Sequence, residues 1–337
     1  MNLKLNFQII FMDIEKILAE KGHYIDKELK KAFPKKGITN LYDAVWYHMG
    51  TGGKRIRPVL AIATCEALGG NSKKVVPFAA ACEVLHNWLL IHDDIEDGDR
   101  VRRDKPAVWV KFGLGHGINA GDLMAQKVFE LILSSDLKEK TIFRLIKTMT
   151  DTAIKTAEGQ AMDMNLRGND NPTEKEYMEM VTGKTAYYMT VPITGGAIVA
   201  GASEKTIKKI IEFGMRAGPA FQIADDILDL TSGKGRGEIG RDIKEGKRSL
   251  LAIHCMKKCS KDEKEKLIKI LNKSPESTTN AEVLYVKSLF EKYGSIKYAR
   301  KKAEELIKKA KKTAEGMPPK LGKILIFFAD YLVKRKK

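Results

Sequence analysis

Two short runs of aspartate stand out because their spacing could hold a metal ion. Both runs read Asp-Asp-x-x-Asp, and they comprise Asp93, Asp94, Asp97, Asp225, Asp226 and Asp229. Residues three and four apart are neighbours on a helix, so the carboxylates of each run share one face and repel one another. A hard divalent cation would neutralise them, and oxygen ligands favour Mg²⁺ or Mn²⁺.

Either run alone fits equally well an acidic helix end in water. The pattern occurs twice, however, and each copy follows an apolar helical stretch, which favours a site over surface solvation. If the two helices face each other, six carboxylates converge. Such a cluster could hold several Mg²⁺ ions, which in proteins commonly bridge carboxylates to substrate phosphates.

Basic residues lie near these runs and suit phosphate. They follow the Gly52-Gly53 turn and the first aspartate run, and they comprise Lys54, Arg55, Arg57, Arg102 and Arg103. Arginine forks bind phosphate oxygens in pairs. Lys184 and Thr185 follow Gly183, but the earlier glycine of a P-loop is missing and the context is helical. Each basic cluster alone is more typical of a surface patch.

His86 lies in an apolar stretch, seven residues before Asp93. A histidine in such a place is usually a hydrogen-bonded core residue. Seven residues are two helical turns, so His86 projects on the same face as Asp93, which favours a functional role. His92 projects elsewhere, and we expect it to be structural.

The elements that must position these residues are helices. Apolar residues recur at three- and four-residue spacing over 75–95, 124–133, 142–164, 203–230 and 262–271. Strand-like alternation is scarce, and no glycine or proline cluster is long enough for a linker. The sequence therefore predicts one all-α domain over 1–337, with about ten or more helices.

Composition limits the alternatives. The 337 residues carry a net charge of +17, and residues 298–337 hold more than half of that excess on a helical pattern. A solvated helix face explains this charge better than nucleic-acid binding, because no zinc-finger, RNA-binding or basic-zipper pattern accompanies it. We expect residues 330–337 to form a basic tail.

The termini and cysteines point to a cytoplasmic protein. Residues 1–11 are apolar but too short for a secretory signal and lack a cleavage site, so we expect a disordered extension, with Met1 and Met12 as alternative starts. No apolar run approaches the roughly 20 residues that span a membrane. Four scattered cysteines indicate neither a disulfide framework nor a zinc site.

Taken together, the motifs resemble the trans-isoprenyl diphosphate synthases, or polyprenyl synthetases, and in particular archaeal geranylgeranyl and farnesyl diphosphate synthases. The similar segments are Gly52–Pro58, Leu90–Asp97 with Arg102-Arg103, Gly183–Thr185, Phe221–Asp229 and Met317–Arg335. They occur in the family's order. The resemblance implies an isoprenoid synthase fold, with helices around a deep central cavity, in a homodimer or higher homo-oligomer.

The resemblance also implies a role for each matching residue. The six aspartates correspond to ligands of about three Mg²⁺ ions, which Mn²⁺ could replace. The isopentenyl diphosphate clamp corresponds to Lys54, Arg57, His86 and Arg103. The cations that hold the allylic diphosphate correspond to Arg102, Lys184 and Lys247. The polar residues that line the reacting carbons correspond to Thr185 and Gln222.

One segment departs from a simple match, and another bears on product length. The family's lysine in the glycine-rich loop falls near Gly237 or Glu238, so Lys234 or Arg236 is expected to replace it. In the family, bulk four or five residues before the first aspartate limits product length, and here these residues are Leu89 and Trp88. Helix geometry turns Leu89 more directly toward the site. The large Trp88 resembles archaeal C20 synthases, and a C15 product stays open.

The sequence thus predicts a Mg²⁺-dependent prenyltransferase that condenses isopentenyl diphosphate head-to-tail with dimethylallyl, geranyl or farnesyl diphosphate. The expected products are geranylgeranyl diphosphate, farnesyl diphosphate or both. The expected setting is the cytoplasm, with peripheral membrane contact and no nucleic-acid partner. Two alternatives are a non-catalytic or regulatory partner subunit, which would be expected to carry a damaged aspartate run, and a terpene cyclase, which would not need the Lys54–Arg57 clamp.

Overall fold

The computed structural model describes residues 22–35, 37–53, 55–231 and 239–334. The candidate starts Met1 and Met12, the extension 1–11, and Lys54, Lys234 and Arg236 lie outside the described residues. Within the described part, helices account for nearly all regular structure, and the strands are the two-residue β1 (Val101–Arg102) and β2 (Lys105–Pro106). The all-α prediction is confirmed.

The chain divides into two compact units by its internal contacts. The first comprises Met1–Thr152, Tyr188–Ile211 and Thr313–Phe327, and the second comprises Ala153–Tyr187, Glu212–Lys312 and Phe328–Lys337. The prediction of one domain over 1–337 stays a prediction.

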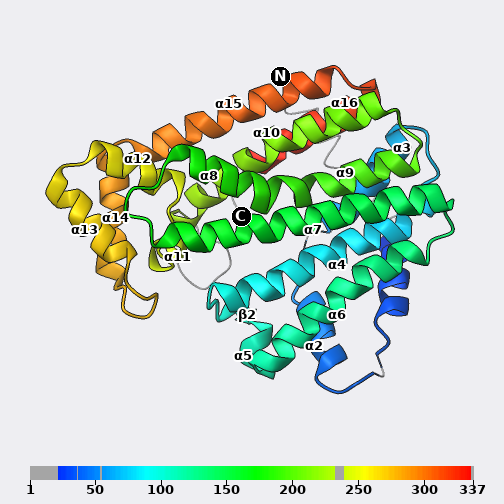
Figure 1. Ribbon diagram of the computed structural model, residues 1–337, viewed down its shortest axis with the longest axis horizontal. Coiled ribbons are helices and arrows are strands. Elements are labelled where there is room, and N and C mark those ends of the chain that lie inside the picture. The colour runs from blue at the N-terminus through cyan, green and yellow to red at the C-terminus, as the bar shows by residue number, and fades with distance from the viewer. Residues whose placement is uncertain (1–21, 36, 54, 232–238, 335–337) are drawn as a thin grey trace. The chain divides into compact units, whose positions relative to one another are not determined.

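The first unit is built around helix α4 (Ser72–Glu96). Its complete helices are α2 (Leu41–Met49), α3 (Ile56–Ala67), α4, α5 (Val108–Phe112) and α6 (Leu114–Leu133). The unit also contains all of α9 (Tyr187–Val199) except its first residue. The Asn71 side chain caps the start of α4 by accepting from the Lys73 amide over 3.0 Å. Helix α4 packs against α3 and along α6, beside which it lies in Figure 1.

Helix α4 is also the one described helix that is long and apolar enough to cross a membrane. Its most apolar stretch has a mean hydropathy of 1.3, and 67% of that stretch is buried inside the protein. Such a pattern is typical of a central core helix, which is how α4 packs here.

The helices that lie wholly within the second unit are short and have well-defined starts. Its complete elements are α8 (Glu174–Val181), the π-helical segment η1 (Thr182–Ala186), α11 (Arg241–Lys244), α12 (Leu250–Lys258), α13 (Lys261–Leu271) and α14 (Asn280–Lys292). Reciprocal capping boxes begin α8, α13 and α14, which satisfies amides that a helix start leaves unpaired. Helix α12 contacts α8, α13 and α14.

Four long helices contribute residues to both units. They are α7 (Glu139–Arg167), α10 (Glu204–Asp229), α15 (Ser295–Glu315) and α16 (Pro319–Lys334). In α15, Ala303, Ile307 and Ala310 are buried while Lys301, Lys308 and Lys309 are exposed. The basic segment is therefore an amphipathic helix with a solvated charged face, as the sequence indicates.

Candidate active site

The first aspartate run occupies the end of α4. Asp93 and Asp94 lie in the last turn, and Asp97 is the residue that ends the helix. Arg102, on the strand β1 that follows, donates from Nε to Asp94 Oδ1 over 2.6 Å and from Nη2 to Asp93 Oδ2 over 3.2 Å. Asp99 Oδ2 lies 3.5 Å from the same guanidinium. A single arginine therefore contacts three carboxylates.

A tight turn sets the direction of Arg102. Strands β1 and β2 pair antiparallel, with Val101 opposite Pro106. The turn residues Arg103 and Asp104 have φ angles of 54° and 60°, in the left-handed region that non-glycine residues seldom adopt. Such conformations persist only where surrounding contacts hold them, and they cluster at functional sites.

Burial controls the electrostatics at the end of α4. Asp94 is fully buried, and this burial raises its pKa to about 7 against the opposing influence of Arg102. Its Oδ2 has no hydrogen-bond partner among the described residues. A buried carboxylate oxygen without a donor is chemically suited to a divalent cation, so the residues fit the metal that the aspartate run implies.

The predicted isopentenyl diphosphate clamp is partly assembled within the first unit. Arg57 Cζ lies 4.7 Å above the ring centroid of Tyr188, and the His86 ring is parallel to that same tyrosine within 7°, at 6.3 Å. Arg103 donates to Thr51 Oγ1 over 3.3 Å and to the Gly52 carbonyl. The structure therefore places His86 and Arg57 on one tyrosine, which the sequence did not single out. The fourth member, Lys54, lies outside the described residues.

The histidines near this clamp are held neutral. Burial is the main cause that lowers the pKa of His86 well below its usual value, and Arg57 and Arg103 add to it. Burial likewise lowers the pKa of His48 to about 3, with further contributions from Arg103 and Arg102. His86 would therefore serve as a neutral hydrogen-bonding group near arginines rather than as a charge.

The second aspartate run, at the end of α10, accepts hydrogen bonds from several uncharged donors. Asp226 accepts from the Tyr177 hydroxyl over 2.8 Å and from Gln222 Nε2 over 3.0 Å. Asp229 accepts from the backbone amide of Asp242 over 3.1 Å. Asp226 and Asp229 are buried, whereas Asp225 is half-buried.

The two polar residues predicted beside the reacting carbons are connected. Thr185 Oγ1 donates to Gln222 Oε1 over 3.0 Å, and the Gln222 amide continues to Asp226. The structure thus brings Thr185, Gln222 and Asp226 into one hydrogen-bonded chain. Burial is the main cause that raises the pKa of Tyr177 well above its usual value, so the hydroxyl remains a donor.

Lys184 and Thr185 sit in the π-helical segment η1, an unusual local geometry. Short π-helical turns occur frequently at functional sites. A Cβ added to Gly159 of α7 would lie 2.0 Å from the Lys184 amide nitrogen, so only glycine lets α7 pass this close. Lys184 Nζ forms an ion pair of 2.8 Å with Asp163, and Arg167 lies 3.6 Å from that same carboxylate.

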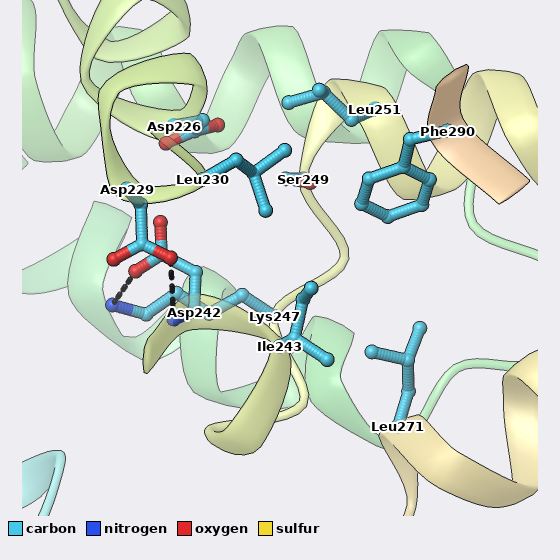
Figure 2. Close-up of a pocket in the computed structure, with 10 residues that line it drawn as sticks. All are labelled: Asp226, Asp229, Leu230, Asp242, Ile243, Lys247, Ser249, Leu251, Leu271 and Phe290. Atoms are coloured by element: carbon cyan, nitrogen blue, oxygen red, sulfur yellow. Dashed lines mark hydrogen bonds and ion pairs between the residues drawn. The ribbon is translucent and has the colours of Figure 1, made fainter. Parts of the chain in front are cut away.

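Two adjoining cavities in the second unit contain most of its predicted site residues. One is lined by Asp163, Tyr177, Met180, Lys184, Gln222, Asp226, Lys247, Arg248 and Ser249. The other, shown in Figure 2, is lined by Asp226, Asp229, Leu230, Asp242, Ile243, Lys247, Ser249, Leu251, Leu271 and Phe290. Lys184, Gln222, Asp226 and Lys247 therefore meet around one cavity.

Lys247 is closely held in this region. Its Nζ lies 2.7 Å from Glu245 and 3.5 Å from Asp242, and Figure 2 shows it beside Asp229 and Asp242. The next residue, Arg248, is only 1% exposed and donates to the backbone carbonyls of Asn169, Gly246 and Leu271. Arg248 thereby fixes the backbone that carries Lys247.

Sequence spacing missed the partners that organise these residues. They are Asp99, Asp163, Tyr177, Tyr188, Asp242, Glu245 and Arg248. Tyr177 is 49 residues from Asp226, and Asp163 is 21 residues from Lys184. No helical periodicity connects residues so far apart. Charged and polar residues in apolar surroundings were still a usable signal, because such residues need partners when they are buried.

Basic clusters and buried carboxylates on an all-helical fold are chemically suited to a polyanionic substrate and divalent metal ions. The polyprenyl synthetase family model matches residues 38–288, and the chain belongs to that family. It is a short-chain prenyltransferase with the isoprenoid synthase fold.

Curated relatives and solved structures support the same family assignment. The chain is 34% identical to a geranylgeranyl diphosphate synthase of Sulfolobus acidocaldarius over 92% of this chain and 95% of that protein. It is also 34% identical to a short chain isoprenyl diphosphate synthase of Methanothermobacter thermautotrophicus, over 96% and 99%. A geranylgeranyl pyrophosphate synthetase structure from Pyrococcus horikoshii matches with a TM-score of 0.87 at 33% identity, covering 96% of this chain and 99% of that one.

Proposed function

We propose that the enzyme condenses isopentenyl diphosphate with an allylic diphosphate, head to tail, in the presence of Mg²⁺. The observation that carries this proposal is the coexistence of two complete aspartate runs with cations for two diphosphates. The names of the relatives from Sulfolobus and Methanothermobacter support the same chemistry. In this proposal Arg57, His86 and Arg103, with Lys54, bind isopentenyl diphosphate.

The aspartates of the two runs are the proposed metal ligands, and Asp94 illustrates the fit. Its buried oxygen lacks a donor among the described residues, and hard carboxylate oxygens suit Mg²⁺ or Mn²⁺. Bound metal, about three ions by the family resemblance, would neutralise the diphosphate leaving group as its bond to carbon breaks.

The chain's own residues have separate proposed tasks. Arg102, Lys184 and Lys247 hold the allylic diphosphate and stabilise the negative charge that it gains as it leaves. The Thr185 hydroxyl and Gln222 amide face the carbon that becomes positive, and their hydrogen bond keeps both dipoles oriented. The double bond of isopentenyl diphosphate then attacks that carbon, and the departing diphosphate accepts the proton that is lost.

The proposed product is geranylgeranyl diphosphate, with farnesyl diphosphate as the shorter alternative. Trp88 or Leu89, one to two turns before Asp93, limits growth of the chain. The relative from Sulfolobus acidocaldarius is named a geranylgeranyl diphosphate synthase, whereas another relative, from Natronomonas pharaonis, is named a geranylfarnesyl diphosphate synthase. We further propose a homodimer or higher homo-oligomer in the cytoplasm, with peripheral membrane contact.

The test is transfer from labelled isopentenyl diphosphate to dimethylallyl, geranyl and farnesyl diphosphate, each followed by chain-length analysis. We expect elongated diphosphates that require added Mg²⁺ and disappear with a chelator. Hydrocarbon products from an allylic diphosphate alone would instead identify a terpene cyclase. A folded protein that transfers nothing with any primer would favour a non-catalytic partner subunit.

A further inference from the structure

A hydrogen bond on α4 ties the indole of Trp88 to the residue directly before the first aspartate run. Trp88 Nε1–H donates to His92 Nδ1 over 3.2 Å. The two rings meet edge to face, with centroids 6.3 Å apart, and both side chains are half-buried. Residues four apart lie one above the other on a helix, so the contact needs no distortion of α4.

This hydrogen bond also fixes the state of the imidazole. Because Nδ1 accepts, it carries no proton, and the neutral ring must carry its proton on Nε2. Asp122 Oδ1 lies 3.7 Å from Nε2, which is beyond hydrogen-bond range, and the Asp122 side chain is 64% exposed. The aspartate therefore adds only a weak orienting attraction, and Trp88 is the specific partner.

Helix α6 closes the other side of the imidazole. A Cβ added to Gly121 would lie 2.1 Å from His92 Nε2 and 2.4 Å from His92 Cδ2. Real Cβ atoms do not approach other atoms so closely, so the ring fits only because residue 121 has no side chain. The imidazole is thus confined between Trp88 on its own helix and the backbone of α6, which packs along α4.

We infer that His92 is a positioning residue that sets product length by holding the Trp88 indole in one orientation. The inference rests on the proposed function, in which the bulk at positions 88 and 89 limits chain growth. A held indole stops growth at one length. A released indole adopts further rotamers, some of which make room for another isoprene unit.

A matched pair of variants separates the hydrogen bond from the bulk of the ring. His92→Leu introduces an apolar side chain of similar reach and removes the hydrogen-bond acceptor. His92→Asn instead offers Oδ1 close to the position of Nδ1. We expect His92→Leu to raise the share of products one isoprene unit longer by about fivefold, the shift that one ordinary hydrogen bond supports. His92→Asn should stay near the wild-type distribution.

The dependence of the His92→Leu effect on Trp88 distinguishes a role in positioning the indole from a general destabilisation of the helix. Trp88→Phe removes the donor and keeps an aromatic ring, so His92→Leu should change little further in that background. Gly121→Ala should displace the imidazole from α6 and lengthen products, although Trp88 and His92 themselves are not mutated. This variant also keeps the test valid if His92→Leu fails to fold, which circular dichroism would reveal.

The outcomes are separable from those of the proposed function. Wild-type products with an unchanged length distribution in both folded His92→Leu and Gly121→Ala would overturn the inference alone. An equal shift from His92→Leu in the wild-type protein and in the Trp88→Phe background would overturn it as well. A wild-type enzyme that forms no elongated product would refute the proposed function, and this inference with it.

Discussion

The two aspartate runs have the same sequence pattern but differ in what holds them. At the end of α4 the partner is a guanidinium, since Arg102 contacts Asp93, Asp94 and Asp99. At the end of α10 the partners include a phenol, a side-chain amide and a backbone amide. Among the contacts of the described residues, ion pairs are prominent at the first run and directional hydrogen bonds from uncharged groups at the second.

This difference predicts different responses to mutation. Removing a charge from a buried ion pair leaves an uncompensated ion, which costs several kcal/mol, whereas removing one neutral donor from a carboxylate costs about 1.5–3 kcal/mol. The identical motif should thus be sensitive to different substitutions at its two occurrences, even though both are proposed to bind Mg²⁺.

The largest effects should come from the aspartates themselves, where the two runs should behave alike. We expect Asp93→Ala and Asp225→Ala each to lower turnover by roughly 10²–10³-fold, because charge stabilisation at the leaving group is lost. Steady-state assays at saturating Mg²⁺ measure this, and circular dichroism checks the fold. Near-wild-type rates in either variant would remove that run from the proposed metal site.

Arg102→Met is the first test of whether the two runs are stabilised by different kinds of contact. It leaves three carboxylates without their guanidinium, and we expect it to lower the free energy of unfolding by about 3–5 kcal/mol in metal-free protein. Urea denaturation measures the change. Added Mg²⁺ should recover part of the loss, because the cation compensates the same carboxylates. A loss below about 1 kcal/mol would contradict charge compensation at this run.

Acid should lower the stability of the protein through His48, which lies near the arginines beside the first run. Its pKa is about 3 in the folded protein, against 6.5 unperturbed, because of burial and nearby Arg103 and Arg102. Between these values only the unfolded chain binds the proton, so stability falls as the pH decreases from 6.5 toward 3. The contribution of this group is about 1.4 kcal/mol per pH unit.

His48→Gln is the matched control for that slope. It removes the titrating group, so its free energy of unfolding should depend less on pH over the same range. Denaturation series at several pH values compare the two proteins. Parallel slopes for wild type and His48→Gln would show that His48 does not stay neutral in the folded protein.

The smallest effect should come from Tyr177→Phe, the counterpart of Arg102→Met at the second run. The change removes the hydroxyl that donates to the Asp226 carboxylate but keeps the buried ring, so we expect a loss of about 1.5–3 kcal/mol. Thermal or urea unfolding measures it. A loss as large as that of Arg102→Met would show that the two runs are not held by different means.

Local periodicity was sufficient to predict the helices that carry the site. The predicted spans 75–95, 142–164 and 203–230 correspond to α4 (Ser72–Glu96), α7 (Glu139–Arg167) and α10 (Glu204–Asp229). The β1–β2 hairpin was not predicted. Its turn uses Arg103 and Asp104 at positive φ, without the glycine or asparagine by which such turns are usually recognised.

Sequence motifs found candidate ligands but not the residues that orient them. Asp226 was predicted as a ligand, but its hydroxyl donor Tyr177 lies in a different helix, and only the folded chain joins them. Arg102 was predicted to hold a diphosphate, a role that stays a prediction, whereas its ion pairs with Asp93 and Asp94 are observed. Pairing across helices depends on tertiary packing, which residue spacing within one helix does not encode.

The segment η1 makes the number of residues matter as much as their identity. A π-helical turn holds more residues than an α-helical one, so deleting a single residue from Thr182–Ala186 would let the segment relax into ordinary α-helix. Residues within the segment would then change direction, whereas the helix beyond it would keep nearly its original orientation. Lys184 and Thr185 would face a different direction with their chemistry intact, so this segment should accept many substitutions more readily than one deletion.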